Sequence, residues 1–313
     1  MKIAALFPGQ GSQEVGMGRS LYEALPTARR LFDTADEVLG YPLTRLMFEG
    51  PAEELTATEN TQPAIYLASY AAWACLREKL PALSWDSAAG HSLGEYSAYA
   101  AAGTLSFEDG LRLVRRRGEL IRDAAHDNPG TMAALIGLDE ERVIALLAEL
   151  PDPRPIELAT INSPVQIVVA GKRAALEEFV ESAKEAGAKR AVVLDVSGPF
   201  HTSFIAEAGR RLTAELENLE LSEPAFPVAT NVTGAPAADV AEIKDTLARQ
   251  VAEPVRWLDC ARHLVDRGVE LAVEFGHGRV IAGLMKRSAK GLQVLSLGDP
   301  EGLEKTASIL TQS

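Results

Sequence analysis

Gly90-His91-Ser92-Leu93-Gly94 is the stretch that decides how this chain folds, because it places a serine between two glycines where a strand is expected to meet a helix. Residues 83–89 form a short run that ends in small side chains, and residues 96–102 are rich in alanine, which favours helix. In this order, Gly-x-Ser-x-Gly is the pattern of a nucleophile elbow, which presents the serine Oγ at the tip of a sheet. Ser92 is therefore a candidate nucleophile, with an ordinary Gly-Ser turn as the alternative.

The composition around this stretch is that of a globular protein. The 313 residues are 47% hydrophobic and 24% charged, enough for one large domain or a domain with a smaller one inserted. The net charge of −13 disfavours broad binding to nucleic acid or to anionic membranes. The N-terminal apolar run is too short for a signal peptide and no run could span a bilayer, so a cytoplasmic location is expected.

The cysteines and histidines do not suggest a metal or disulfide site. Cys75 and Cys260 lie far apart, each within an apolar helical pattern, which predicts two buried free thiols. None of the five histidines has the spacing of a metal-ligand pair. We therefore expect no metal.

The first third of the chain has the pattern of an α/β protein. Residues 3–7 are typical of a buried strand and lead into Pro8-Gly9-Gln10-Gly11-Ser12-Gln13. The two glycines would let backbone amides come close to a ligand, although a plain connection is the alternative. Helical spacing at 18–39 and 64–80 predicts helices around a mainly parallel sheet, with the active site at the carboxyl ends of its strands.

Residues 128–197 have a different pattern and predict a small inserted subdomain. The expected order is a strand at 132–138, a helix at 139–150, strands at 156–162 and 166–170, a helix at 173–187 and a strand at 190–196. This β-α-β-β-α-β order is that of a ferredoxin-like unit. Residues 1–127 and 198–313 would then form the large subdomain, and Ala225 to Asn231 another of its strands.

The helix that is expected after Ser106 contains Arg115-Arg116-Arg117. Consecutive helical positions point about 100° apart, so the three guanidinium groups cannot share one environment. One of them could turn inward toward the elbow, and the spacing does not say which.

His201 follows a Gly-Pro turn and is the candidate base. A lone loop histidine is commonly a surface residue, but an imidazole with an ordinary pKa of about 6.5 is well suited to take a serine proton. Ser92 and His201 occur in the order expected of elbow enzymes. With the Leu93 amide and an amide of residues 9–11 as oxyanion donors, these features indicate acyl transfer through serine.

Together these motifs resemble the malonyl-CoA:acyl carrier protein transacylase family, part of the acyltransferase domains of fatty acid and polyketide synthases. The resemblance covers essentially the whole chain. It rests on Phe7-Pro8-Gly9-Gln10-Gly11-Ser12-Gln13, Gly90-His91-Ser92-Leu93-Gly94-Glu95, Arg117, Asn162-Ser163-Pro164, Gly198-Pro199-Phe200-His201, Asn231, and Gln250 before Pro254-Val255-Arg256-Trp257. Each motif alone is weak, whereas the set is specific.

The resemblance implies an α/β-hydrolase-like large subdomain that carries the ferredoxin-like insertion. It implies that Ser92 is acylated and that His201 is the general base. The backbone carbonyl of Gln250 would take the place of the acid in a triad. The backbone amides of Gln10 and Leu93 would form the oxyanion hole.

The resemblance also selects Arg117 among the three arginines as the residue that binds the substrate carboxylate. Malonyl differs from acetyl by this carboxylate, which a guanidinium can hold with two parallel hydrogen bonds. The other implied substrate-binding residues are Gln10, Asn162, Phe200 and Asn231. The chain departs from the family pattern at Pro199 and His277, where alanine and proline are usual, which leaves the acyl preference open.

The implied reaction moves a malonyl group from coenzyme A to the phosphopantetheine thiol of an acyl carrier protein, through a malonyl-serine, and supplies fatty acid synthesis. No cofactor, nucleic acid or membrane is implied, and a monomer is expected. The alternatives are a discrete acyltransferase of a polyketide assembly line, a serine thioesterase or hydrolase, and a non-catalytic docking module.

Both acyl carriers are anionic, so the mouth of the site is expected to be locally basic. The candidate residues are Arg115, Arg116, Lys286, Arg287 and Lys290. Solvent-facing charge without a partner is the alternative for each.

Overall fold

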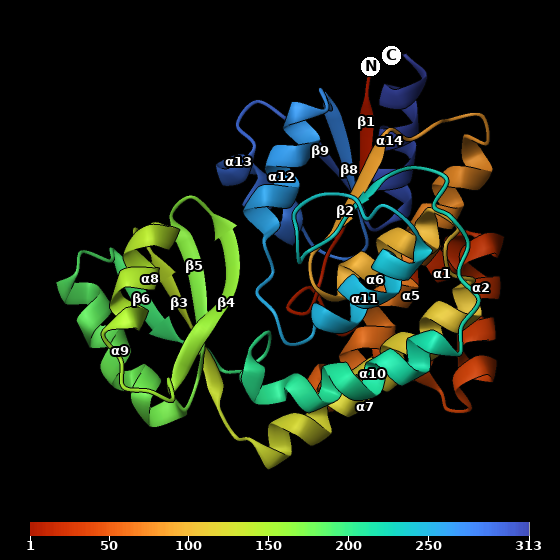
Figure 1. Cartoon of the computed structure of the whole chain (residues 1–313). Coiled ribbons are helices and arrows are strands. Elements are labelled where there is room, and N and C mark those ends of the chain that lie inside the picture. The colour runs from red at the N-terminus through yellow and green to blue at the C-terminus, as the bar shows by residue number, and fades with distance from the viewer. Residues whose placement is uncertain (313) are drawn as a thin grey trace.

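A five-stranded parallel sheet forms the centre of the larger lobe in the computed structural model, which describes residues 1–312 (Figure 1). Its strand order is β7-β2-β1-β8-β9. The strands are β1 (Ile3–Phe7), β2 (Ser87–Gly90), β7 (Val228–Ala229), β8 (Leu271–Phe275) and β9 (Gln293–Leu297). The predicted mainly parallel sheet is confirmed, but two strands are shorter than the predicted 83–89 and 225–231.

Helices cover both faces of this sheet. They are α1 (Arg19–Ala24), α2 (Pro26–Leu39), α3 (Leu43–Glu49), α4 (Ala52–Thr56), α5 (Thr58–Lys79), α6 (Leu93–Ala101), α7 (Phe107–Asp127), the 3-10 turn η1 (Ser203–Ile205), α10 (Ala206–Glu217), α11 (Val240–Arg249), α12 (Trp257–Asp266), α13 (Val280–Ser288) and α14 (Pro300–Thr311). Alternate residues of β1 enter different cores, because side chains of a strand alternate between its faces. Ala5 and Phe7 pack with α5 and α6, and Ala4 and Leu6 with α12 and α13.

Helices α2 and α5 begin at residues that the spacing of apolar residues does not predict. The helix predicted for residues 18–39 is two helices, because Pro26 starts α2 and proline is suited to the first position of a helix. The helix predicted to begin at Ala64 begins at Thr58, with Pro63 inside it. Cys75 and Cys260 are free and buried, as predicted. No helix in residues 1–312 has the length and hydropathy needed to cross a membrane.

A four-stranded antiparallel sheet forms the smaller lobe, to the left in Figure 1. Its elements are β3 (Thr131–Ile136), α8 (Glu140–Ala148), β4 (Ile156–Ser163), β5 (Gln166–Gly171), α9 (Arg173–Glu185) and β6 (Arg190–Val193). The predicted β-α-β-β-α-β order is therefore present, although β6 ends three residues earlier than expected. The subdomain boundaries at residues 128 and 197 stay predictions.

The two faces of the small sheet have different surroundings. One face packs against α8 and α9 through residues such as Leu135, Val143 and Phe179. On the other face Met132 and Val168 form a separate cluster, against which Phe200 packs. Strand β4 is also bonded to the large lobe, since the Ile161 amide donates to the carbonyl of Val255 at 2.9 Å. One face of the small sheet is thereby turned toward the end of the parallel sheet.

Candidate active site

The turn between β2 and α6 places Ser92 at the carboxyl end of the parallel sheet. Ser92 has φ 51° and ψ −111°, a region that non-glycine residues rarely occupy. The flanking glycines are needed for space. A Cβ on Gly90 would lie 1.9 Å from the carbonyl of Gly94, and a Cβ on Gly94 would lie 2.1 Å from the carbonyl oxygen of Phe7. The strain of the elbow is thus carried by the serine itself, while the glycines allow the close packing around it.

His201 lies next to the serine. Its Nε2 is 2.8 Å from Ser92 Oγ, and its Nδ1 is 2.8 Å from the backbone carbonyl oxygen of Gln250. A carbonyl only accepts hydrogen bonds, so Nδ1 carries the proton and Nε2 is left as an acceptor. Burial, and then the charge of Arg117, lower the pKa of His201 to about 3. The imidazole is therefore neutral near pH 7 and can take the serine proton.

Arg117 is the one arginine of the triplet that turns inward, and only 2% of its surface is exposed. Its Nη2 donates to Gln250 Oε1 at 2.8 Å and to Ser92 Oγ at 3.2 Å, and its Nη1 donates to Gln62 Oε1 at 2.7 Å. The guanidinium also lies over the ring of Tyr96, with 5.1 Å to the centroid. A charged, hydrogen-bonded group thus lies directly beside the serine hydroxyl.

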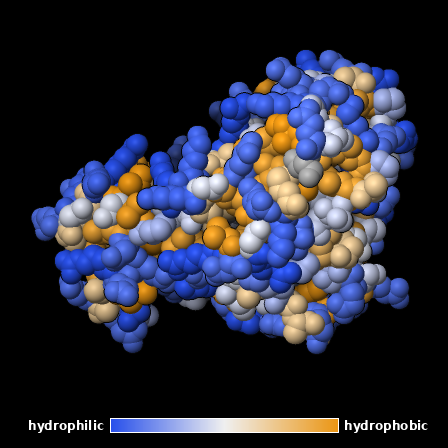
Figure 2. All heavy atoms as spheres, turned by 90° about the horizontal axis from the view of Figure 1, so that it is seen from above, coloured by the Kyte–Doolittle hydropathy of each residue, from blue (hydrophilic) through white to orange (hydrophobic). Residues whose placement is uncertain are grey.

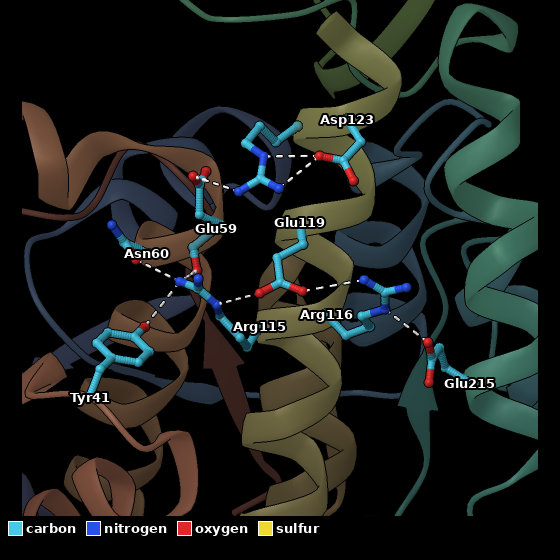
Figure 3. A network of polar contacts seen from close by, with 9 residues as sticks. Tyr41, Glu59, Asn60, Arg115, Arg116, Glu119, Asp123 and Glu215 are labelled. Atoms are coloured by element: carbon cyan, nitrogen blue, oxygen red, sulfur yellow. Dashed lines mark hydrogen bonds and ion pairs between the residues drawn. The ribbon is translucent and has the colours of Figure 1, made fainter. Parts of the chain in front are cut away.

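Arg115, on the same helix as Arg117, binds the start of α5 (Figure 3). It donates to Asn60 Oδ1 at 2.6 Å and to the carbonyl of Glu59 at 2.9 Å, and it pairs with Glu119 at 2.9 Å. The Glu59 carbonyl is the one that would bond to the amide of residue 63 in a regular helix, and Pro63 has no amide hydrogen. Arg115 therefore supplies the hydrogen bond that Pro63 cannot.

Arg116 joins α7 to α10, also seen in Figure 3. Its Nε is 2.9 Å from Glu215, and its Nη1 is 3.4 Å from Glu119. Gly118 brings α7 close to α5, because a Cβ there would lie 2.7 Å from Glu59 Cα. Arg115 and Arg116 are thus engaged in holding three helices together, which does not favour them as the docking residues that were expected. Lys286, Arg287 and Lys290 are exposed.

Gln250 contacts both the base and the arginine, and its own side chain is fully buried. Besides accepting from Arg117, it donates from Nε2 to the Ser92 carbonyl at 2.9 Å and to Glu95 Oε2 at 2.7 Å. Burial raises the pKa of Glu95 to about 7. The sequence reasoning quoted Glu95 as part of a motif but assigned it no role. The available signal was an acidic residue within the alanine-rich helix that follows the serine.

The two asparagines that were expected to bind substrate have different positions. Asn162 Oδ1 is 2.8 Å from Nε2 of His91, and both residues line the cavity. Asn231 is fully buried; its Oδ1 accepts from the Ser92 amide at 2.7 Å and its Nδ2 donates to the Gly90 carbonyl at 2.7 Å. Asn231 therefore holds the backbone of the elbow and is not among the residues that line the cavity. This position does not match the expectation that Asn231 binds substrate directly.

The two residues predicted to supply the oxyanion donors are Gln10 and Leu93. Gln10 follows β1 and lines the cavity. The preceding loop approaches the elbow closely, since a Cβ on Gly9 would lie 2.3 Å from the carbonyl oxygen of His91. Leu93 is the first residue of α6, a position whose amide the helix does not use.

A cavity of about 800 Å³ opens beside Ser92, between the two lobes. Its polar lining includes Gln10, Ser92, Arg117, Asn162 and His201, and its apolar lining includes Met132, Val168, Leu194, Val196 and Phe200. Seen from above, apolar residues come to the surface where the molecule narrows between the lobes (Figure 2). The residues 194–200 that follow β6 thus contribute one wall of the site.

Comparisons with known proteins show which proteins this chain is similar to. A family model described as an acyl transferase domain matches residues 5–293. The chain is 42% identical to the malonyl CoA-acyl carrier protein transacylase of Bacillus subtilis, over 99% of this chain and 98% of that protein. Among solved structures it is similar to an acyl-carrier-protein S-malonyltransferase from Bartonella henselae, with a TM-score of 0.95, 38% identity and coverage of 99% and 100% of the two chains.

A second solved structure contains a carrier protein. It is described as a type II PKS acyl-carrier protein in complex with its malonyl-transacylase, PlMCAT:AntF in the holo form. The similarity has a TM-score of 0.95 and 38% identity, and covers 99% of this chain and 100% of that chain.

Proposed function

We infer the function from the premise that this chain belongs to the acyl transferase family, among the malonyl CoA-acyl carrier protein transacylases. It is a transferase that moves a malonyl group from coenzyme A to an acyl carrier protein, in support of fatty acid synthesis. One observation carries the assignment of roles to residues. Ser92 Oγ lies 2.8 Å from His201 Nε2 and 3.2 Å from Arg117 Nη2, in one cavity.

In the first half-reaction, Ser92 Oγ attacks the thioester carbon of malonyl-CoA while its proton moves to His201 Nε2. The bond between the acyl carbon and the coenzyme A sulfur breaks, and His201 returns the proton to the leaving thiolate. The Gln250 carbonyl, 2.8 Å from Nδ1, stabilises the imidazolium that forms in between. The product is malonyl-Ser92.

The second half-reaction repeats these steps with the phosphopantetheine thiol of the carrier protein. His201 takes the thiol proton, the thiolate attacks the malonyl ester, and Ser92 regains its proton. In both steps, negative charge develops on the acyl oxygen, and the amides of Gln10 and Leu93 are the proposed donors to it. The proposed chemistry uses only these side chains and the two substrates.

Arg117 is proposed to bind the free carboxylate of the malonyl group. Its Nε is unpaired in the described residues, and its Nη2 lies beside the nucleophile. A guanidinium holds a carboxylate with two charge-assisted hydrogen bonds, which acetyl cannot make. Phe200 and Asn162 line the same cavity and are proposed as further substrate contacts.

We propose that the chain acts as a cytoplasmic monomer that binds malonyl-CoA and carrier protein and neither nucleic acid nor membranes. The polyketide alternative has specific support, because one similar structure holds a polyketide carrier protein with its transacylase. Both pathways use the same chemistry, so the choice of carrier protein distinguishes them.

The intact mass of the protein after incubation with malonyl-CoA tests the proposal. The wild-type protein should gain one malonyl group, and Ser92→Ala should gain none, because the nucleophile is absent. The adduct should persist in buffer and disappear when a holo carrier protein is added. An adduct on Ser92→Ala would overturn the assignment, and loss of the adduct to water alone would indicate a hydrolase.

A further inference from the structure

Glu95 is a buried carboxyl group for which the proposed reaction has no step. It lies in the first turn of α6, three residues after Ser92, and its side chain has 0% exposure. Its Oε2 accepts from Gln250 Nε2 at 2.7 Å and from the backbone amide of Asn231 at 3.0 Å. Its Oε1 has no hydrogen-bond partner among the described residues. Burying such a group is unfavourable because water can no longer solvate it, so a partly unsatisfied buried carboxyl group needs an explanation.

The partner of Glu95 suggests what the task is. Gln250 holds His201 through its backbone carbonyl and holds Arg117 through its side-chain oxygen, each at 2.8 Å. The side-chain nitrogen of Gln250 faces Glu95 and the Ser92 carbonyl. Glu95 therefore contacts Gln250, which, like Ser92, is hydrogen-bonded to both the base and the carboxylate-binding arginine.

The hydrogen bonds of Glu95 decide which way the Gln250 amide points. The two ends of an amide have similar shape, but its nitrogen only donates and its oxygen only accepts. An ionised carboxylate also only accepts, so the amide nitrogen must face Glu95 and the oxygen must face Arg117. In the flipped amide, nitrogen would face the guanidinium, donor against donor, and oxygen would face the carboxylate.

The charges of Glu95 and Arg117 also favour the arrangement in which Gln250 lies between them. No carboxylate in residues 1–312 forms an ion pair with Arg117. Burial lowers the pKa of Arg117, and Tyr96 and then the charge of Glu95 oppose this shift. In return, Arg117 acts to lower the pKa of Glu95. Glu95 thus acts on Arg117 across the Gln250 side-chain amide and without an ion pair, so the guanidinium stays available to the substrate carboxylate.

We propose that Glu95 is a positioning residue for malonyl transfer: acting through the Gln250 side-chain amide, its carboxylate orients Arg117 to bind the malonyl carboxylate. This inference rests on the proposed function. Glu95 does not touch substrate or the reacting atoms, so its effect should depend on whether the substrate has a carboxylate.

Glu95→Gln tests the inference, because it removes the charge and keeps the size of the side chain. We expect kcat/KM for loading from malonyl-CoA to fall roughly ten-fold, mainly through KM, as for loss of a hydrogen bond to a charged group. Loading from acetyl-CoA should change less than about two-fold, since acetyl does not use Arg117. Equal loss with both acyl groups would show structural support only and would overturn the inference.

Glu274→Gln is the matched control. Glu274 also has 0% exposure, and its carboxylate accepts from the amides of Ile281 and Ala282 at 2.8 and 3.0 Å, but it lies on β8 and does not line the cavity. The same chemical change there should leave the ratio of malonyl to acetyl loading unchanged. A similar fall in this ratio in both variants would contradict a specific role of Glu95.

A double-mutant cycle tests the route through Gln250. Glu95→Gln in a Gln250→Ala background should cause no further fall in the loading ratio, because the amide that transmits the effect is gone. An undiminished fall in that background would contradict the route. Malonyl loading of the wild-type protein is measured alongside, and its absence would refute the proposed function itself rather than the role of Glu95.

The wild-type protein gives a second test if Glu95→Gln does not fold. With a pKa of about 7, Glu95 loses its charge as the pH falls from 8 to 6, so the ratio of malonyl to acetyl loading should fall over this range. The phenols of Tyr96 and Tyr99 and the thiol of Cys260, whose pKa values burial raises, stay neutral there. His201 is neutral above its pKa of about 3. A constant ratio between pH 8 and 6 would overturn the inference.

Discussion

Ser92 and His201 both have positive φ, at 51° and 60°. Non-glycine residues in this region carry backbone strain of about 1–3 kcal/mol each, which only a well-determined surrounding structure can maintain. Here the surroundings include Asn231, which holds the Ser92 amide, and Gln250, which holds the imidazole. At the scale of single residues, the backbone strain is located at Ser92 and His201, the two residues whose side chains share a proton.

Arg117→Ala is the residue-scale prediction with the largest expected effect. Loading from malonyl-CoA should fall by about two orders of magnitude or more, because two hydrogen bonds to a charged carboxylate are lost. Loading from acetyl-CoA should hold or rise, since the variant removes a buried charge for which acetyl has no carboxylate. Loading rates with both substrates, read by intact mass, check this.

Arg116→Ala is the control for that measurement. Arg116 is the adjacent arginine, but it faces Glu215 on α10 rather than the cavity. Its removal should leave the ratio of malonyl to acetyl loading as it is. If Arg117→Ala reduced both loadings equally, the guanidinium would not be the source of acyl selectivity.

The sequence allowed Ser92, His201 and Arg117 to be chosen before the structure, from residue chemistry and family resemblance. The helical spacing could not choose among the three arginines, because the choice depends on how α7 packs against α5 and α10. The contacts of Glu95 and Asn231 also could not be predicted from the sequence. Their partners, Gln250 and Ser92, are 155 and 139 residues away along the chain.

At the scale of elements, the wrong boundaries have physical causes. The strand predicted for 225–231 is only Val228–Ala229, because the chain then turns and the Thr230 amide donates to Ala235. That turn places Asn231 behind the elbow. Likewise, Pro63 lies within α5 because an arginine from another helix satisfies the carbonyl that it leaves unpaired.

The role of Arg115 in α5 gives an element-scale prediction. Arg115→Ala should lower the free energy of unfolding by about 1–3 kcal/mol, because the Glu59 carbonyl and Glu119 lose a charged partner. Alanine at position 63 would restore an amide donor, so the cost of Arg115→Ala should be smaller in a Pro63→Ala background. Urea unfolding of the four proteins measures this difference.

Arg112→Ala serves as the comparison, since the one ion pair of Arg112 within residues 1–312 is an exposed pair with Asp109 on the same helix. Such pairs contribute about 0–1 kcal/mol. An equal cost of Arg115→Ala with and without Pro63 would mean that the carbonyl of Glu59 does not depend on the arginine.

At the scale of the whole molecule, the site is formed by the meeting of two sheets. The element order of the small lobe could be predicted, because its strands and helices follow one another in a known unit. The strand order β7-β2-β1-β8-β9 could not, since parallel pairing joins segments that are far apart in the chain. The cavity is lined by residues of both lobes, so its shape could not be predicted from the sequence.

The surface charge of α13 gives a prediction for carrier-protein use. Lys286 and Arg287 are exposed near the small lobe, where Arg287 donates to Gln166 at 2.6 Å. Reversing both charges should raise KM for the acidic carrier protein several-fold, and by about one order of magnitude at low salt, where charges are screened less. The KM for malonyl-CoA should change less. Steady-state kinetics with each substrate varied in turn check this.

Reversal of Lys172 and Arg173 is the matched control. These two adjacent basic residues are exposed at the start of α9, which covers the small-sheet face opposite the cavity. This double variant should use carrier protein normally. No change on reversing Lys286 and Arg287 would exclude α13 as the docking surface.

The most direct measurement of the central claim mixes the protein with equal amounts of malonyl-CoA and acetyl-CoA and locates the acyl group by peptide mass. The account predicts a malonyl group on Ser92 in large excess over acetyl, which a holo carrier protein then removes. An acyl group on another residue, or acetyl and malonyl in equal amounts on Ser92, would contradict it.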